Sequence, residues 1–267
     1  MHIILSNGIK IPAIGFGTWQ IPAGDIAYRA TFAALQAGYR HIDTAMAYGN
    51  EKSIGKALKD SGIDRNRIFV TTKLPAEIKG YQEAMATFHR SLGNLGLDFI
   101  DLYLIHAPKP WGVAGDGMNY MDRNIATWQA FEKLYNDGLI RAIGVSNFEP
   151  KHLTKLLSVA KVKPMVNQIK IHPGFIPVDN IDYCHSKQIA LEAYSPLATG
   201  RLLSNQQLER FAQKYNRSAA QIAIRWSYQN GYLPLPKSTN ENRIKENINI
   251  FDFTISPEDM SEITKIG

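Results

Sequence analysis

The sequence has one cysteine, no long apolar run and no low-complexity tract. With Cys184 alone, the chain cannot form an internal disulfide or a cysteine-rich zinc or iron–sulfur site. The N-terminal stretch MHIILSNGIKIPAIGFG lacks a basic start followed by a long apolar segment, and nowhere are 18 consecutive residues apolar. We therefore expect neither export nor a membrane span, and the expected compartment is the cytoplasm.

A strong bias of charge is also missing. The 30 Lys and Arg residues against 24 Asp and Glu leave a net charge of +6, which would suit an anionic partner. The basic residues are scattered, and no segment resembles an arginine-rich arm or a recognition helix. We expect a small anionic molecule and no nucleic acid. With 267 residues, 45% of them hydrophobic, the chain can bury one large core, so we expect one domain over residues 1–267 and a monomer.

Short β-branched runs alternate with amphipathic stretches typical of helices. The expected strands are 15–19, 41–45, 68–74, 99–107, 139–147, 164–171, 189–197 and 232–238. The expected helices include 25–37, 51–62, 81–95, 123–137, 151–160, 178–187, 218–229 and 240–248. Eight such units predict an α/β protein with a (β/α)₈ barrel, which typically takes roughly 250 residues.

A doubly wound sheet is the alternative architecture. Two observations favour the barrel: no GxGxxG turn follows any strand, and the first residues look like a hairpin with Asn7-Gly8 at its turn. We expect this hairpin to cap the barrel floor. Two further helical stretches, 204–215 and 257–265, exceed the eightfold count and are expected outside the barrel.

Polar side chains stand at the ends of nearly all the expected strands, where barrel enzymes carry their catalytic residues. They are Asp43, Lys73, His106, Ser146, Asn147, Gln168, Tyr194, Lys237 and Ser238. Each has an ordinary structural explanation taken singly; Asn147, for example, could cap the next helix. Asp43, Lys73 and His106 nevertheless end three successive strands, and Tyr48 follows in the loop after Asp43, which indicates a shared site.

Three long motifs resemble the aldo-keto reductase family, which includes general aldehyde and ketone reductases of bacteria. They are GYRHIDTAMAYGNEKSIG from Gly38 to Gly55, LIRAIGVSNF from Leu139 to Phe148, and LPKSTNENRIKEN from Leu235 to Asn247. Their order, together with Lys73 and His106, makes the resemblance specific, and it spans the whole chain. It implies reduction of aldehydes or ketones to alcohols by hydride transfer from NADPH.

The resemblance also implies that Tyr48 gives the proton to the carbonyl oxygen. A free tyrosine has a pKa of about 10, so bringing it near 7 would take roughly 4 kcal/mol. A Lys73 ammonium about 4 Å away supplies about 1 kcal/mol in water and about 4 in a sheltered pocket. Asp43 would keep the buried Lys73 charged, and a neutral His106 would orient the carbonyl. No metal is expected, because the other histidines lack a ligand spacing.

The implied cofactor contacts fall into groups. The nicotinamide amide would contact Ser146, Asn147 and Gln168, and its ring would stack on Tyr194. Further contacts are Thr18 and Asp43, and the pyrophosphate would lie beside Ser195 and Leu197. The 2′-phosphate would be bound by Lys237, Ser238 and Arg243, which favours NADPH over NADH. The adenine would contact Glu246 and Asn247.

The substrate side is less defined. Trp19 and Trp111 are candidate walls beside Tyr48 and His106. Many family members carry Trp directly after the catalytic histidine, whereas this chain has Ala107, so we expect an open, permissive pocket. Two other functions remain: an NADPH-binding regulatory barrel without catalysis, and a barrel isomerase or aldolase that forms a Schiff base on Lys73.

Overall fold

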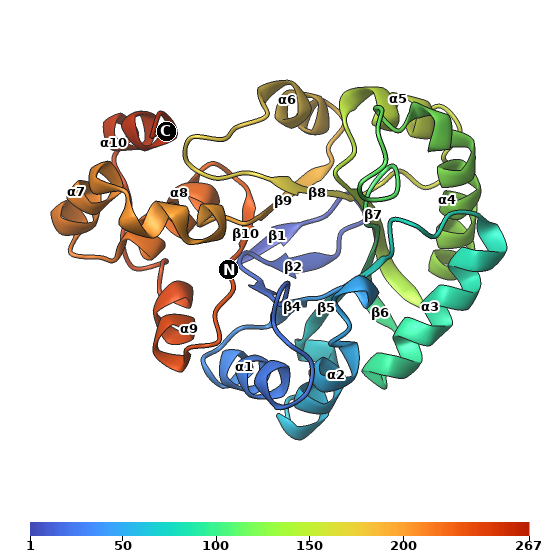
Figure 1. The fold of residues 1–267 in the computed structure, drawn as a ribbon, viewed down its shortest axis with the longest axis horizontal. Coiled ribbons are helices and arrows are strands. Elements are labelled where there is room, and N and C mark those ends of the chain that lie inside the picture. The colour runs from blue at the N-terminus through green and yellow to red at the C-terminus, as the bar shows by residue number, and fades with distance from the viewer. Residues whose placement is uncertain (267) are drawn as a thin grey trace.

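The computed structural model describes residues 1–266. Within them, a parallel sheet of eight strands runs in the order β3 to β10. The strands are Phe16–Gly17, His41–Asp43, Phe69–Leu74, Ile100–Ile105, Ile140–Ser146, Val166–Lys170, Ala190–Tyr194 and Leu233–Leu235. The N–H groups of Gly15 and Gly17 donate to the carbonyls of Pro234 and Pro236 at 3.0 and 2.9 Å, which joins β3 to β10. The sheet thereby closes on itself (Figure 1), and the predicted (β/α)₈ barrel is confirmed.

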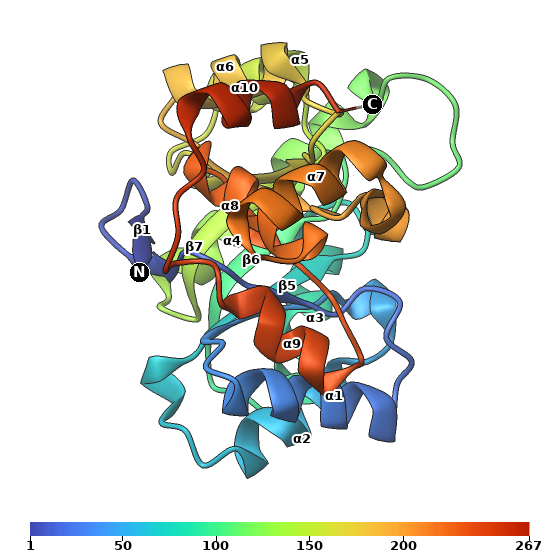
Figure 2. The same cartoon turned by 90° about the vertical axis from the view of Figure 1, so that its left-hand side faces the viewer.

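Helices surround these strands (Figure 1). They are α1 Asp25–Gln36, α2 Glu51–Asp60, α3 Tyr81–Leu95, α4 Met121–Asn136, α5 Pro150–Leu157, α6 Val178–Ser186, α8 Ala219–Gln229 and α9 Glu241–Ile248. Two additional helices, α7 Gln206–Tyr215 and α10 Pro257–Thr264, lie together on the outside (Figure 2). The two predicted extra helices are therefore present.

The first of these extra helices begins later than expected. Residues Ala198–Ser204 form a separate 3₁₀ segment, η4, and α7 starts only at Gln206. The reason is Asn205, whose side chain accepts a hydrogen bond from the Leu208 N–H and so caps α7. The last helix starts as expected, with Ser256 as its cap and Pro257 in the first helical position.

The N-terminal hairpin pairs β1 (His2–Ile4) with β2 (Lys10–Pro12) in antiparallel fashion. At its turn the Gly8 N–H donates to the Leu5 carbonyl at 2.8 Å, and Gly8 has φ of 84°, a left-handed conformation that glycine adopts readily. The Asn7 Nδ2 donates to the carbonyl of Arg141, near the start of β7, at 3.0 Å. The hairpin therefore covers the N-terminal ends of the strands, and the long loop after β6 lies at the opposite end of the barrel (Figure 2).

A buried ion cluster ties the barrel floor together. Asp101, near the start of β6, is fully buried and accepts hydrogen bonds from Arg65 Nη2 at 2.6 Å and Arg141 Nη1 at 2.9 Å. Its Oδ2 also accepts from the Val70 N–H at 2.9 Å. A buried carboxylate that satisfies its oxygens in this way fixes β5, β6 and β7 relative to one another.

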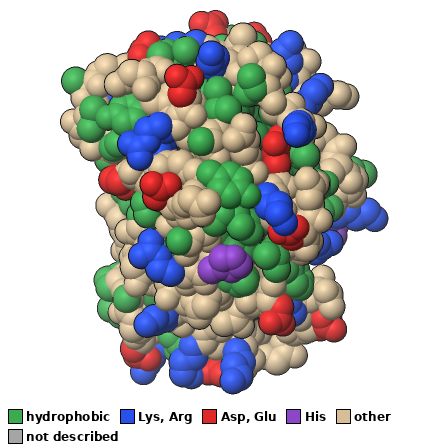
Figure 3. Space-filling view, turned by 90° about the vertical axis from the view of Figure 1, so that its right-hand side faces the viewer, with side chains coloured by type: hydrophobic (Ala, Val, Ile, Leu, Met, Phe, Trp, Pro, Cys, Tyr) green, Lys and Arg blue, Asp and Glu red, His purple; other side chains and the backbone are tan. Residues whose placement is uncertain are grey.

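The outer surface carries charges of both signs. On the face formed by α3 and α4, Lys and Arg side chains are interspersed with Asp and Glu (Figure 3). Among residues 1–266, no helix combines the length and the apolar character needed to cross a bilayer.

Helices α2 and α3 approach each other closely at Gly55. A Cβ atom on Gly55 would lie 2.2 Å from the Leu95 carbonyl oxygen, far inside van der Waals contact. The contact atom is backbone and cannot rotate away, so the two helices would have to separate to accept a larger residue.

We predict that Gly55→Ala lowers the free energy of unfolding by about 2 kcal/mol, because overpacking outweighs the gain in helix propensity. Urea denaturation measures this. Gly93 is a matched control, since it lies in α3 and a Cβ atom added to it would have no neighbour within 4 Å. Gly93→Ala should raise stability by up to about 1 kcal/mol. Stabilisation by both substitutions would show that the helices do not meet at Gly55.

Candidate active site

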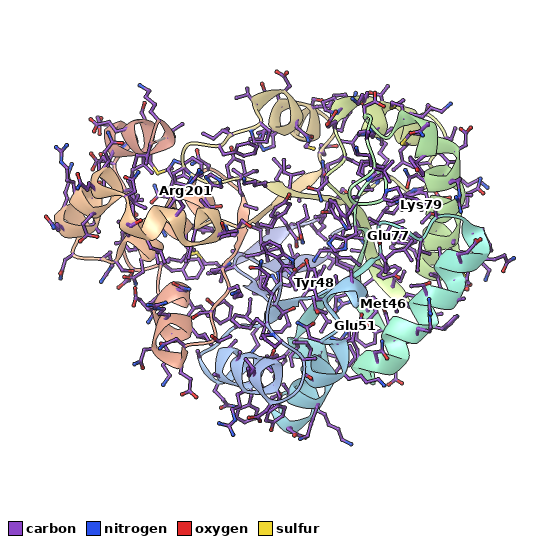
Figure 4. The ribbon with its side chains drawn as sticks, in the orientation of Figure 1. Met46, Tyr48, Glu51, Glu77, Lys79 and Arg201 are labelled. Atoms are coloured by element: carbon purple, nitrogen blue, oxygen red, sulfur yellow. The ribbon has the colours of Figure 1, made fainter. Side chains whose placement is uncertain are left out.

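Four polar side chains meet at the C-terminal end of the barrel. Asp43 ends β4, Lys73 lies near the end of β5, and His106 directly follows β6. Tyr48 ends the short 3₁₀ segment η1 (Met46–Tyr48) that follows β4. Figure 4 shows Tyr48 toward the middle of the ring of strands. The structure thus brings together the four residues that the sequence motifs indicated.

Lys73 is the centre of this group. Its Nζ lies 2.8 and 2.9 Å from the two carboxylate oxygens of Asp43, 2.9 Å from the Thr44 carbonyl oxygen and 3.3 Å from the Tyr48 hydroxyl. The side chain is fully buried. Burial lowers the pKa of Lys73, but Asp43 and then Tyr48 raise it, and the result lies above the ordinary lysine value. Asp43 thus keeps the buried ammonium charged.

Burial shifts the pKa of Tyr48 in the opposite direction from that of Lys73. It raises the pKa of the phenol, the positive charge of Lys73 lowers it, and Asp43 raises it again, so that the net pKa lies above the ordinary value. The loss of hydration thus outweighs the attraction of the Lys73 cation, and the net direction of the shift is away from neutral pH. The hydroxyl therefore keeps its proton at neutral pH.

His106 lies between two aromatic rings. Its ring centroid is 5.6 Å from that of Tyr48 and 5.5 Å from that of Trp111, which meets it edge-on at 89°. Burial, followed by the charges of Lys73 and Lys79, lowers the pKa of His106 to about 3. The imidazole is therefore neutral at physiological pH.

Three side chains fix the backbone that follows β6. Asn147 Nδ2 donates to the carbonyl of residue 106 at 3.0 Å. Lys79 Nζ donates to the next carbonyl, of residue 107, at 2.6 Å, and Asn124 Nδ2 to that of residue 108 at 2.7 Å. Lys79 is almost completely buried, and this burial lowers its pKa to about 7. In Figure 4 it lies on the α4 side of the barrel. Neither Lys79 nor Asn124 was predicted from the sequence, where both resemble ordinary polar residues of exposed segments.

The residues expected at the nicotinamide form one hydrogen-bonded group. Ser146 Oγ donates to the Gln168 carbonyl at 2.8 Å and accepts from Asn147 Nδ2 at 3.0 Å. The Tyr194 hydroxyl donates to Asn147 Oδ1 at 2.8 Å. Asn147 is not a helix cap, since α5 is capped by Glu149. These contacts fix the strand ends in one arrangement.

Gln168 also joins two carboxyl groups. Its Nε2 donates to Asp43 Oδ2 at 2.8 Å and to Glu192 Oε2 at 2.7 Å. Glu192 lies in the middle of β9 and is 1% exposed, and burial followed by the charge of Asp43 raises the pKa of Glu192 to about 8. This residue was not predicted from the sequence. A charged side chain in the middle of the apolar run 189–194 was the available signal.

The group opens into a cavity of about 660 Å³. Its walls include the predicted residues Trp19, Asp43, Tyr48, His106, Trp111, Ser146, Asn147, Gln168, Tyr194, Ser195, Leu197 and Lys237. Other wall residues were not predicted from the sequence: Gln20, Ala47, Thr199, Leu203 and Leu235.

The remaining predicted residues lie outside this cavity wall. Ser238, Arg243 and Glu246 follow β10 in the loop and in α9, and Asn247 in the same helix is buried. Thr18 is fully buried, and its hydroxyl donates to the Asp43 carbonyl at 2.9 Å, so that it supports Asp43 from behind. Lys73 likewise lies behind Asp43 and Tyr48.

The aromatic wall beside His106 comes from Trp111. Ala107 is buried and does not line the cavity, whereas Trp111 does so with 51% of its surface exposed. Trp19 lines the cavity too and is 46% exposed. The residue type after the histidine therefore does not leave the site without an aromatic wall.

Residues 13–267 match the model of the Aldo/keto reductase family. The chain is similar to glyoxal reductase of Bacillus subtilis (strain 168), with 46% identity over 263 residues that cover 98% of this chain and 91% of the relative. It is also similar to 9,11-endoperoxide prostaglandin H2 reductase of Trypanosoma cruzi (strain CL Brener), with 42% identity over 268 residues that cover 99% and 91% of the two chains.

Solved structures agree with these relatives. An aldo/keto reductase from Brucella melitensis superposes with a TM-score of 0.93 at 44% identity, covering 100% of this chain and 99% of the other. A Bombyx mori aldo-keto reductase in complex with NADP superposes with a TM-score of 0.90 at 34% identity, covering 100% and 92%. The chain therefore belongs to the aldo/keto reductase family of oxidoreductases that act on carbonyl compounds.

Proposed function

We propose that the protein reduces aldehydes and ketones with NADPH and that Tyr48 donates the proton. The observation that carries this proposal is that Tyr48 lines the cavity and that its hydroxyl lies 3.3 Å from a charged, buried Lys73. Two relatives are named as reductases, and a structural relative was solved with NADP, which supports the choice of cofactor.

The cavity suits a nicotinamide cofactor. One wall presents the hydroxyl of Ser146 and the amides of Asn147 and Gln168, and the ring of Tyr194 stands beside them. Lys237 in the cavity wall and Arg243 in the following helix α9 are exposed, and neither forms an ion pair within residues 1–266. When bound, NADPH supplies the hydride that reduces the carbonyl carbon.

Side chains of the protein then neutralise the negative charge that develops on the carbonyl oxygen. As that oxygen becomes negative, Tyr48 gives it the phenolic proton, and the Lys73 ammonium stabilises the tyrosinate that remains. Asp43 holds the Lys73 side chain in place and keeps its amine protonated. Because burial keeps Tyr48 protonated until this moment, the acid is present across the neutral pH range.

His106 has a different task. Its neutral ring cannot act as the main acid, since the pKa of about 3 means that it carries no extra proton at neutral pH. A neutral imidazole can still donate one N–H to the substrate oxygen, and its fixed position between Tyr48 and Trp111 would orient the carbonyl.

The substrate side of the cavity is uncharged. Trp19, Ala47, Trp111 and Leu203 line it, and both tryptophans are about half exposed. This half-open wall supports a permissive pocket for carbonyl compounds of different shapes. The Schiff-base alternative is disfavoured, because such a lysine needs a neutral amine, whereas Lys73 is held charged by Asp43 and does not line the cavity.

We predict that Tyr48→Phe lowers kcat for NADPH oxidation by about 10²- to 10⁴-fold, because the proton donor is lost. The assay follows NADPH absorbance over a panel of aliphatic, aromatic and sugar-like carbonyls. The affinity for NADPH, measured by tryptophan fluorescence, should change little. Tyr28→Phe, on α1 outside the cavity, is the control. Undiminished turnover by Tyr48→Phe would refute the assigned acid, and NADPH binding by the wild type without any turnover would favour a regulatory barrel.

The protonation state of His106 gives a separate prediction. Because the pKa of His106 falls from the ordinary histidine value of 6.5 to about 3, the ring should stay neutral at every pH above about 4. Nitrogen chemical shifts of the imidazole, assigned by their loss in His106→Gln, should therefore stay constant between pH 5 and 8. A ring that gains a proton between pH 6 and 7 would contradict the buried, neutral orienting role.

Lys237→Ala should weaken NADPH binding by roughly 10- to 100-fold and leave NADH binding nearly unchanged. A charged hydrogen bond to phosphate contributes about 1.5–3 kcal/mol, and only NADPH has the 2′-phosphate. Dissociation constants from fluorescence titration measure the effect. Lys245→Ala, an exposed lysine of α9, is the matched control and should alter neither affinity. An equal loss for both cofactors on Lys237→Ala would remove the phosphate-binding role.

A further inference from the structure

Glu192 is a buried carboxyl group that the proposed proton transfer does not use. It lies on β9 directly opposite Gln168 of β8 in the strand register, and both side chains point into the barrel. Glu192 Oε2 accepts a hydrogen bond from Gln168 Nε2 at 2.7 Å, and the same nitrogen donates to Asp43 Oδ2 at 2.8 Å. Gln168 therefore joins two carboxyl groups from two other strands.

This arrangement fixes which way the amide of Gln168 points. An amide nitrogen has two protons, and the two carboxyl groups use both of them. If the amide were turned over, its oxygen would lie 2.8 Å from the charged carboxylate oxygen Oδ2 of Asp43, which would repel it. The oxygen must therefore point away from Asp43 and Glu192. Gln168 forms part of the cavity wall, so its one remaining polar atom is an acceptor available to a ligand there.

We propose that Glu192 is a positioning residue for the cofactor: together with Asp43 it holds the Gln168 amide so that the oxygen accepts an N–H from the nicotinamide carboxamide. The inference rests on the proposed function, since it assigns Gln168 to the nicotinamide end of NADPH. It adds a residue that touches neither cofactor nor substrate and acts only through Gln168.

The charges around Glu192 determine which substitution can replace it. The ionisable groups are Asp43 and His41 on β4 and Lys73 on β5, whereas β10 presents Leu233 opposite Glu192. His41 Nε2 lies 3.8 Å from Glu192 Oε1, and burial with the charge of Lys73 lowers the pKa of His41 to about 3, so that ring is neutral. Burial and Asp43 raise the pKa of Glu192 to about 8, which keeps this carboxyl largely protonated at pH 7. A glutamine, which is neutral and has an acceptor oxygen, should therefore substitute for it.

The test compares two ligands that differ only in the nicotinamide half. Isothermal titration calorimetry at pH 7 measures the affinity for NADPH and for adenosine 2′,5′-bisphosphate, which has the phosphate end but no nicotinamide. Glu192→Leu removes the acceptor and should weaken NADPH about 10-fold, or about 1.4 kcal/mol, without changing the affinity for the bisphosphate. Glu192→Gln should restore NADPH affinity to within about twofold.

A matched control comes from Glu132 of α4, another buried glutamate, whose Oε1 accepts from the N–H groups of Lys161 and Val162. Glu132→Leu should change neither affinity, even where it lowers stability. Equal weakening of both ligands by Glu192→Leu would mean a general structural defect and would overturn the proposal. Unchanged NADPH affinity in Glu192→Leu would overturn it as well. If the wild type binds the bisphosphate but not NADPH, the proposed function itself fails, whatever the variants do.

Discussion

The charged Lys73 ammonium in the barrel interior is the constraint on which the site depends. An isolated charge costs several kcal/mol when it leaves water, so the barrel must surround it with acceptors. Asp43 offers both carboxylate oxygens, and the Thr44 carbonyl adds a third. These groups come from β4 and its continuation, next to β5, so the parallel pairing of two strands sets the geometry. Tyr48 follows on the same segment and is thereby held beside the cation.

Burial also determines the protonation states of the other two groups, Tyr48 and His106. Loss of hydration disfavours the charged form of any group, so it raises the pKa of an acid and lowers that of a base. Tyr48 consequently keeps its proton, while His106 remains without a second one. The two rings meet edge to face with centroids 5.6 Å apart, yet in the proposed reaction only Tyr48 serves as the acid at neutral pH. Their different roles in the proposed reaction thus follow from the burial of both groups as much as from their residue types.

Most of the architecture, and the meeting of Asp43, Tyr48, Lys73 and His106, could be predicted from the sequence, because both depend on local patterns. Alternating strand and helix patterns predicted the barrel, Asn7-Gly8 predicted the turn, and strand-end polar residues predicted the site. The start of α7 was misplaced, since the break at Asn205 depends on one capping side chain. Glu192 and Lys79 were missed for a different reason. Their partners are Gln168 and the Ala107 carbonyl, 24 and 28 residues away, and such contacts form only when neighbouring strands pair in the correct register.

The departure at Ala107 shows how the fold compensates for a changed residue. The backbone after His106 is fixed by donors at three consecutive carbonyls, so the direction in which the loop leaves β6 is fixed too. A wall placed by that loop then does not require a large side chain immediately after the histidine. Trp111, a few residues later, meets His106 edge-on while half of its surface faces solvent. In the proposed reaction, a wall held at the His106 ring but open on its outer side would confine the carbonyl group and leave the rest of the substrate unconstrained.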